Sequence, residues 1–281
     1  MAEFQERIHL VARLGRLPRQ PLPLAPSLRH GRPLPRLVHA QLEELRLACS
    51  DPGTRIQVER LHHRLLRGDW GQYESAKAEL DHALLLLRHG IPVAMVPETQ
   101  QKTADFRCDR PEGVFYAEVT AMIGRGHRRS QSLRRCLLEA EGEEKHDPDR
   151  HTGWMLILRI CARIVQKAKQ LQRYTDPVLL AVTLPRPLWA RRSDRESVDL
   201  SRLVGAVTVM LPKVPHVSAV LISLWHVDPQ PLKACLRFDH VTVMERSKLE
   251  RDQPRVRALL FNPWAGSQFR EEPQTVLKGL V

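Results

Sequence analysis

The chain has 281 residues, enough for one large domain or two small ones around a sizeable core. It carries 44 Lys and Arg against 32 Asp and Glu, a formal net charge of +12, and this arginine-rich excess favours a polyanionic partner such as nucleic acid. There is no signal segment and no apolar run long enough to cross a bilayer, so we expect a cytoplasmic protein without a membrane anchor. The five scattered cysteines include no CxxC pair, which predicts free thiols, and the absence of zinc-ligand spacing predicts no structural zinc.

The N-terminal part of the chain divides into an arm and a helical region. Residues 1–38 mix proline, leucine and arginine so densely that no helix can persist, which predicts an extended basic arm. The arm could follow a phosphate backbone, dock on an acidic protein partner or stay solvated, and the sequence leaves these alternatives open. The helical region, residues 39–72, has apolar residues at helical spacing over Leu37–Ala48 and Arg55–Leu66.

A longer amphipathic helix, from about Tyr73 to His89, is predicted to begin the main domain, residues 73–265. Its apolar stripe comprises Ala76, Leu80, Ala83, Leu84 and Leu87. Gly90 follows as a C-cap, since glycine accepts the left-handed conformation in which many helices end. The helix also carries Glu79, the first of three acidic residues in an otherwise apolar unit that ends at Thr120.

Three strands follow in quick succession and predict an antiparallel meander. They are expected over Ile91–Val96, Thr103–Cys108 and Val114–Met122. Asp105 lies on the second strand and Glu118 on the third. The period of two along a strand directs Glu118 and Thr120 to the same face.

A basic loop containing glycine follows the third strand, and glycine lets a loop approach a phosphate backbone closely. The positive charge of the chain is therefore clustered beside the carboxylates. We expect this loop to contact nucleic acid, although solvated loops of similar composition are common. Its basic residues are Arg125, His127, Arg128, Arg129, Arg134 and Arg135.

A second amphipathic helix is predicted over Trp154–Arg173. Its polar stripe faces either a ligand or water, and Arg163 is expected to contact nucleic acid. The residues of this stripe are Arg159, Arg163, Lys167 and Gln170.

Continuous apolar runs over Pro177–Leu184 and Val217–Trp225 are typical of strands covered on both faces. A helix over Leu200–Leu211 separates them, so we expect a parallel or mixed sheet that continues the meander, with helices on its faces. Leu259–Gly266 predicts a last extended segment, and the C-terminal tail, residues 266–281, carries no pattern.

The order of these features resembles the PD-(D/E)XK nuclease superfamily, which includes many restriction endonucleases and recombination nucleases. The resemblance runs from roughly Glu79 to Leu184. Glu79 matches the glutamate of the family's helix, and Asp105 in the segment Thr-Ala-Asp-Phe matches the PD motif. Glu118-Val119-Thr120 stands where (D/E)-x-K is expected. Ala104 replaces the motif proline, and Thr120 replaces the motif lysine.

The resemblance implies an α/β fold, namely a restriction-endonuclease-like mixed central sheet flanked by helices, to which this chain adds the basic arm and the helical region. It implies that Asp105, Glu118 and Glu79 hold Mg²⁺ or Mn²⁺, where Glu79 could hold a second ion or orient a ligated water. These three acids and Thr120 are the expected catalytic residues, together with an amine that a threonine hydroxyl cannot replace. The candidates for that amine are Lys167 first, then Lys169, then Lys102.

The function that the resemblance implies is a metal-dependent endonuclease that hydrolyses phosphodiester bonds, with DNA favoured, in defence, repair or mobile-element processing. One alternative is a nucleic-acid-binding or assembly subunit that keeps the fold but does not cut, because Thr120 has replaced the lysine. Another is a structural protein whose arm docks on an acidic protein partner. Enzymes of this fold often act as dimers, so a homodimer is also considered.

Overall fold

The computed structural model describes residues 34–49, 51–66, 70–97, 103–122, 148–184, 196–230, 232, 239–248 and 253–281. The predicted arm as far as residue 33, Lys102 and the basic loop from Arg125 to Arg135 lie outside these residues.

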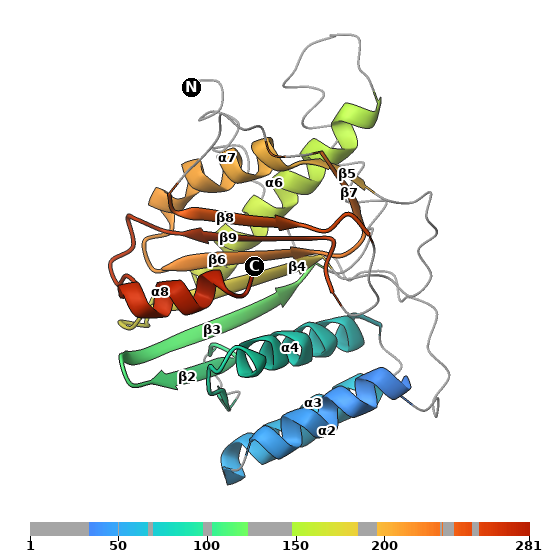
Figure 1. The fold of residues 1–281 in the computed structure, drawn as a ribbon, viewed down its shortest axis with the longest axis vertical. Helices are drawn as coiled ribbons and strands as arrows, with labels where there is room; N and C mark the ends of the chain where they lie inside the picture. The colour runs from blue at the N-terminus through green and yellow to red at the C-terminus, as the bar shows by residue number, and fades with distance from the viewer. Residues whose placement is uncertain are drawn as a thin grey trace.

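A seven-stranded mixed sheet forms the centre of the fold, with the strand order β1-β2-β3-β4-β6-β9-β8 (Figure 1). The strands are β1 (Ala94–Met95), β2 (Phe106–Arg110), β3 (Gly113–Ala121), β4 (Val178–Leu184), β6 (Ala219–Leu224), β8 (Val241–Glu245) and β9 (Val256–Phe261). The β3–β4 and β4–β6 pairs are parallel and the other four pairs are antiparallel. A separate parallel pair consists of β5 (Glu196–Asp199) and β7 (Val227–Gln230). The mixed α/β architecture predicted from the sequence is confirmed.

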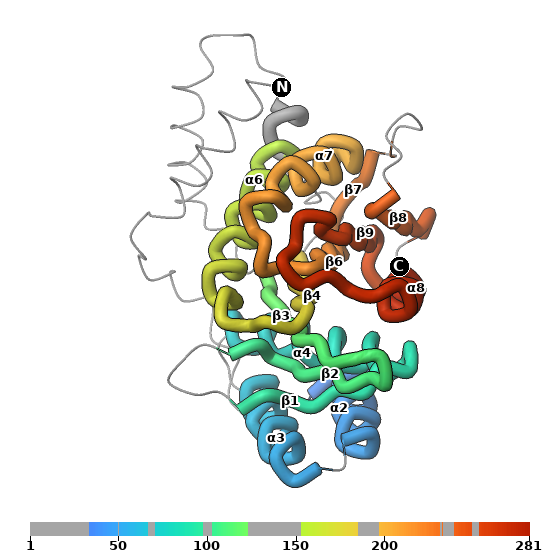
Figure 2. The backbone as a smooth tube through the Cα atoms, turned by 90° about the vertical axis from the view of Figure 1, so that its left-hand side faces the viewer, coloured from blue at the N-terminus to red at the C-terminus, as the bar shows by residue number. Residues whose placement is uncertain are grey.

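Helices cover both faces of the sheet. The helices are α2 (Arg36–Ala48), α3 (Pro52–Leu66), α4 (Trp70–Arg88), α6 (Pro148–Ala168), α7 (Leu200–Met210) and α8 (Glu271–Lys278), with a 3₁₀ turn, η2 (Leu211–Lys213), after α7. One hydrophobic cluster joins α4 and α8 to one face, and a second joins α6 and α7 to the other. Figure 2 shows α6 and α8 on opposite sides of the strands. The N-terminal helices α2 and α3 pack on α4 and share its cluster.

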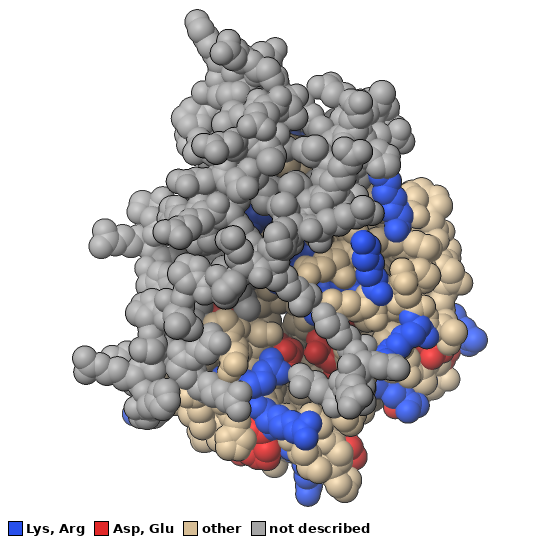
Figure 3. All heavy atoms as spheres, turned by 180° about the vertical axis from the view of Figure 1, so that it is seen from behind, with Lys and Arg blue, Asp and Glu red and all other residues tan. Residues whose placement is uncertain are grey.

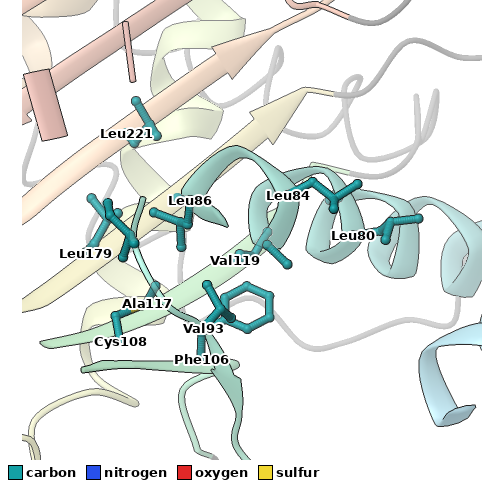
Figure 4. Packing of buried hydrophobic residues seen from close by; sticks show 14 of the residues in the cluster. Leu80, Leu84, Leu86, Val93, Phe106, Cys108, Ala117, Val119, Leu179 and Leu221 are labelled. Atoms are coloured by element: carbon teal, nitrogen blue, oxygen red, sulfur yellow. The ribbon is translucent and has the colours of Figure 1, made fainter. Parts of the chain in front are cut away.

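The helix α4 carries Glu79 and is held in place from two sides. Leu80 and Leu84 belong to the cluster that α2 and α3 share, and Leu86 lies among the residues of the sheet core (Figure 4). The predicted cap is present, because Gly90 has a φ of +71°. The Gly90 N–H donates to the Leu87 carbonyl at 2.9 Å and the Ile91 N–H donates to the Leu86 carbonyl at 3.0 Å, which satisfies the last turn of the helix.

The alternation along β3 decides which side chains reach which face. Ala117 and Val119 point into the cluster beneath α4, where Figure 4 shows them beside Phe106. Glu118 and Thr120, which are also buried, therefore point to the opposite face, which α6 covers. The parallel neighbour β4 is buried on both faces, as its continuous apolar sequence predicts.

The structure contains elements that the sequence did not predict. The tail, in which no pattern is visible, forms α8, and its Leu277 is buried together with Leu280. Arg257 of β9 ties this end to the sheet by donating to the Leu280 carbonyl. An eight-residue helix with few buried side chains is too short for its apolar period to stand out.

On thiols and membrane segments, the structure gives findings only for the residues that it describes. Cys49, Cys108 and Cys161 are free and buried. None of the helices that the structure describes has the length and apolar character needed to cross a membrane.

Glu74 is an ionisable residue buried on α4, with 3% of its surface exposed. Burial raises the pKa of Glu74 from its ordinary value of 4.5 to about 8; nearby Lys77 opposes this shift and Asp81 adds to it. Between these two pKa values the folded protein keeps a proton that the unfolded chain releases. The stability contributed by protonated Glu74 is therefore complete below the unfolded pKa and is lost as the pH rises toward about 8.

We expect Glu74→Gln to remove a pH-dependent loss of stability on the order of 4 kcal/mol, since one pKa unit corresponds to about 1.4 kcal/mol. The measurement is the free energy of unfolding in urea at several pH values between about 5 and 8. Wild type should lose stability over this range and Glu74→Gln should lose much less. Equal slopes for the two proteins would contradict the assignment.

Candidate functional site

The two strand carboxylates, Asp105 and Glu118, meet where β2 begins beside β3. The last register pair there is Phe106 with Ala117, so one further antiparallel step places Asp105 opposite Glu118. Residues opposite each other in such a pair project from the same face and lie close together. The structure therefore brings together two of the acids that the sequence analysis selected.

Backbone hydrogen bonds fix Asp105 at the start of the strand. Its N–H donates to the Ala117 carbonyl at 3.0 Å, and its Oδ2 accepts from the Val119 N–H at 2.6 Å. The preceding residue, Ala104, donates its N–H to the Tyr174 hydroxyl at 2.7 Å. Tyr174 lies just after α6, so the connection to β4 helps to hold the strand that presents Asp105.

The electrostatic environment of Asp105 is rich in negative charge. The residue as a whole is half-buried, but its carboxyl lies deep, and burial is the largest of the causes that raise the pKa of Asp105 well above its usual range. The negative charges of Glu118 and Glu79 raise it further, whereas the Val119 N–H and Lys167 act in the opposite direction. A site where a carboxyl resists ionisation for these reasons is one where a bound cation would be stabilised.

Lys167, the first candidate for the missing amine, lies at this site. Its Nζ forms an ion pair with Oε1 of Glu118, which joins α6 to β3. The Glu118 side chain is 4% exposed and that of Lys167 is 20% exposed. Lys169, the second candidate, is exposed, and Thr120 is buried on the same face as Glu118.

Glu79 approaches Asp105 from α4, and its carboxylate is bound by an arginine. Arg64 of α3 donates from Nη1 to Glu79 Oε2 at 2.8 Å and from Nη2 to Oε1. Ser75, one turn earlier on α4, donates to Oε1 at 3.4 Å. The Glu79 side chain is only 9% exposed and that of Arg64 is 27% exposed, so most of this bidentate pair is withdrawn from water.

Of the residues predicted to contact nucleic acid, Arg163 is the one that the structure describes. It lies on α6 one turn before Lys167, and it donates to the Ala121 carbonyl at 3.4 Å and to Gln166 at 3.0 Å. The remaining predicted contacts, from Arg125 to Arg135, lie outside the described residues. Figure 3 shows Asp and Glu residues in a recess, with lysine and arginine side chains beside it.

Two residues that the sequence analysis did not select belong to the site. Arg64 reaches Glu79 from a helix outside the resemblance, and Tyr174 fixes Ala104 from the segment that follows α6. Arg64 directly precedes the buried Leu65, on a helix whose apolar period predicts packing. That position indicates a side chain at the edge of an interface, but the sequence holds no signal for its partner.

The carboxylates of the site could bind a hard divalent cation only if the cation needs few protein ligands. Among the residues that the structure describes, no group of three or more His, Cys, Asp and Glu side chains could hold a metal ion. Mg²⁺ needs fewer, because it usually keeps several waters and binds one or two protein carboxylates. Asp105 and Glu118 meet that requirement, and a metal-binding role for Glu79 stays a prediction.

Comparison of this chain with models of known families, with curated proteins and with solved structures found no match. The functional conclusion therefore depends on the geometry of the site.

We expect Tyr174→Phe to lower the free energy of unfolding by about 1–2 kcal/mol, because the buried Ala104 N–H would lose its acceptor. The measurement is urea denaturation. Tyr116→Phe is the matched control, because the Tyr116 and Tyr174 rings lie against each other with centroids 4.3 Å apart, and the Tyr116 hydroxyl has no hydrogen bond among the described residues. An equal effect of the two substitutions would show that the hydroxyl of Tyr174 contributes nothing specific.

Proposed function

We propose that this protein is a Mg²⁺- or Mn²⁺-dependent nuclease of the PD-(D/E)XK type that hydrolyses phosphodiester bonds in DNA. The observation that carries the proposal is the meeting of Asp105, Glu118 and Lys167 from β2, β3 and α6. Two adjacent carboxylates and an amine are the side chains that such a reaction needs. The lysine comes from the following helix instead of from position 120.

Each side chain has a definite task in hydrolysis. A bound divalent ion would lower the pKa of a ligated water and offset charge on the scissile phosphate. Asp105 and Glu118 would hold that ion. The ammonium group of Lys167 would orient the attacking water and stabilise negative charge that develops on phosphate oxygens. In the reaction, the water loses a proton as its oxygen bonds to phosphorus, the bond to the leaving oxygen breaks, and the leaving oxygen takes up a proton, so that the net number of protons is unchanged.

The charge of α6 supports nucleic acid as the substrate. From Gly153 to Thr175 the chain holds five Lys and Arg and no Asp or Glu. Arg159, Arg163 and Lys167 follow one another at intervals of four residues, which places them about 6 Å apart along one side of the helix. A row of positive charge that ends at the carboxylates suits a phosphate backbone that crosses the site.

The second candidate function is a subunit that binds nucleic acid without cutting it. The observation that favours it is that Lys167 is bound to Glu118, so that its charge serves an ion pair inside the fold. Thr120 supplies no positive charge in its place. A protein partner for the arm, a homodimer and a cytoplasmic location also stay predictions.

We expect the full chain to cleave DNA in the presence of Mn²⁺ or Mg²⁺, and both Asp105→Asn and Lys167→Gln to lower the rate about 100-fold or more. The measurement is a cleavage panel with double-stranded, single-stranded and branched DNA and with RNA. Lys169→Gln is the matched control, because Lys169 is an exposed lysine two residues away. Circular dichroism checks that each variant folds. Absence of metal-dependent cleavage on every nucleic acid would leave the non-cleaving candidate.

Arg159→Gln and Arg163→Gln should each weaken DNA binding and reduce the slope of log affinity against log salt by about 0.9, as loss of one phosphate contact does. Fluorescence anisotropy with a labelled duplex at several salt concentrations measures both quantities. Arg270→Gln removes an exposed arginine at the start of α8, on the opposite face of the sheet, and should change neither. Equal slopes for wild type and the α6 variants would remove α6 from the interface.

A further inference from the structure

The arginine that binds Glu79 comes from a part of the chain that the nuclease resemblance does not include. Arg64 lies at the end of α3, where the neighbouring Leu61 and Leu65 are buried against the rest of the fold. These two anchors fix the last turn of α3 beside α4. The guanidinium is thereby brought to Glu79 by helix packing.

Both oxygens of Glu79 accept hydrogen bonds from this guanidinium. A carboxylate held in a fork of this kind has its strongest acceptor directions occupied. Ser75 also donates to Oε1, so a metal ion could reach Glu79 without displacing a hydrogen bond only through the remaining lone pair of Oε2. The ion would then lie against a guanidinium that cannot lose its charge.

We propose that Arg64 takes the place of a second metal ion, so that the site binds a single divalent cation at Asp105 and Glu118. The inference rests on the proposed nuclease function and refines it, because Glu79 then acts as a positioning residue for Arg64 and is not a metal ligand. Arg64 in turn provides a fixed positive charge at Glu79 on α4, whereas Lys167 provides one at Glu118 from α6.

The charge count of the site agrees with one ion. When a cation is bound and Asp105 is ionised, Glu79, Asp105 and Glu118 contribute three negative charges, and Arg64 and Lys167 contribute two positive charges. One divalent ion would leave a surplus of one positive charge, which a single phosphodiester group neutralises. Two ions would leave a surplus of three within a partly buried site, where like charges repel strongly.

The test is the number of Mn²⁺ ions bound per full-length chain, measured by equilibrium dialysis or by electron paramagnetic resonance of free Mn²⁺. Wild type should bind one ion. Arg64→Gln should bind two, because it frees Glu79 beside Asp105 and removes a positive charge. The double variant with Glu79→Gln should return to one, and Arg64→Lys, which keeps the charge, should stay at one.

Arg60→Gln is the matched control for these variants. Arg60 lies one turn earlier on α3 and donates to the neutral Gln57 side chain at 3.3 Å, so its loss should leave the stoichiometry at one. Circular dichroism checks that every variant is folded. If Arg64→Gln does not fold, the wild-type stoichiometry still tests the inference, because two bound ions would overturn it.

The failure of this inference and the failure of the proposed function give different results. Two ions bound to wild type, or one ion bound to folded Arg64→Gln, would overturn the role of Arg64 and leave the nuclease proposal standing. No ion bound to wild type would overturn both.

Discussion

The ion pair between Lys167 and Glu118 joins the two parts of the fold on which the site depends. Glu118 is held in position by the register of β3, and Lys167 is held in position by the packing of α6 against the sheet. A one-residue shift in β3 would turn Glu118 toward the cluster beneath α4 and would remove it from the lysine. The pair therefore couples the register of the sheet to the position of the helix, and Asp105 lies next to it.

Local periodicity predicted the central part of the fold. The apolar stripe of α4, the Gly90 cap, the meander and the continuous apolar run of β4 each depend on neighbouring residues, and the structure contains them. The sequence did not predict β5, β7, β8 or α8. The strands among these have four or five residues, and α8 has only two buried side chains within its span, so their patterns are too brief to be distinguished from chance.

The candidate site shows the same division between local and distant contacts. Glu79, Asp105 and Glu118 could be selected because their order along the chain resembles a known arrangement, and Lys167 could be selected because it lies on the polar stripe of the next helix. Arg64 and Tyr174 could not. Their partners lie fifteen and seventy residues away, and the contacts exist only because α3 packs on α4 and the end of α6 lies beside β2. No periodic pattern encodes such pairs.

Five ionisable groups gathered in a partly buried region need an explanation other than stability. Withdrawing an ion from water costs several kcal/mol, and replacing a buried ion pair by apolar residues of similar size is often neutral or stabilising. At 4 Å two unit charges interact by about 4 kcal/mol at an effective dielectric constant of 20. Because Lys167 and Arg64 each carry one positive charge, each of them offsets the charge of one carboxylate. The third carboxyl is that of Asp105, whose pKa is raised by burial first and then by its two acidic neighbours. A buried acid that resists ionisation beside two other acids is difficult to account for in a purely structural network, whereas a divalent cation would stabilise its ionised form and a phosphate group would complete the charge balance.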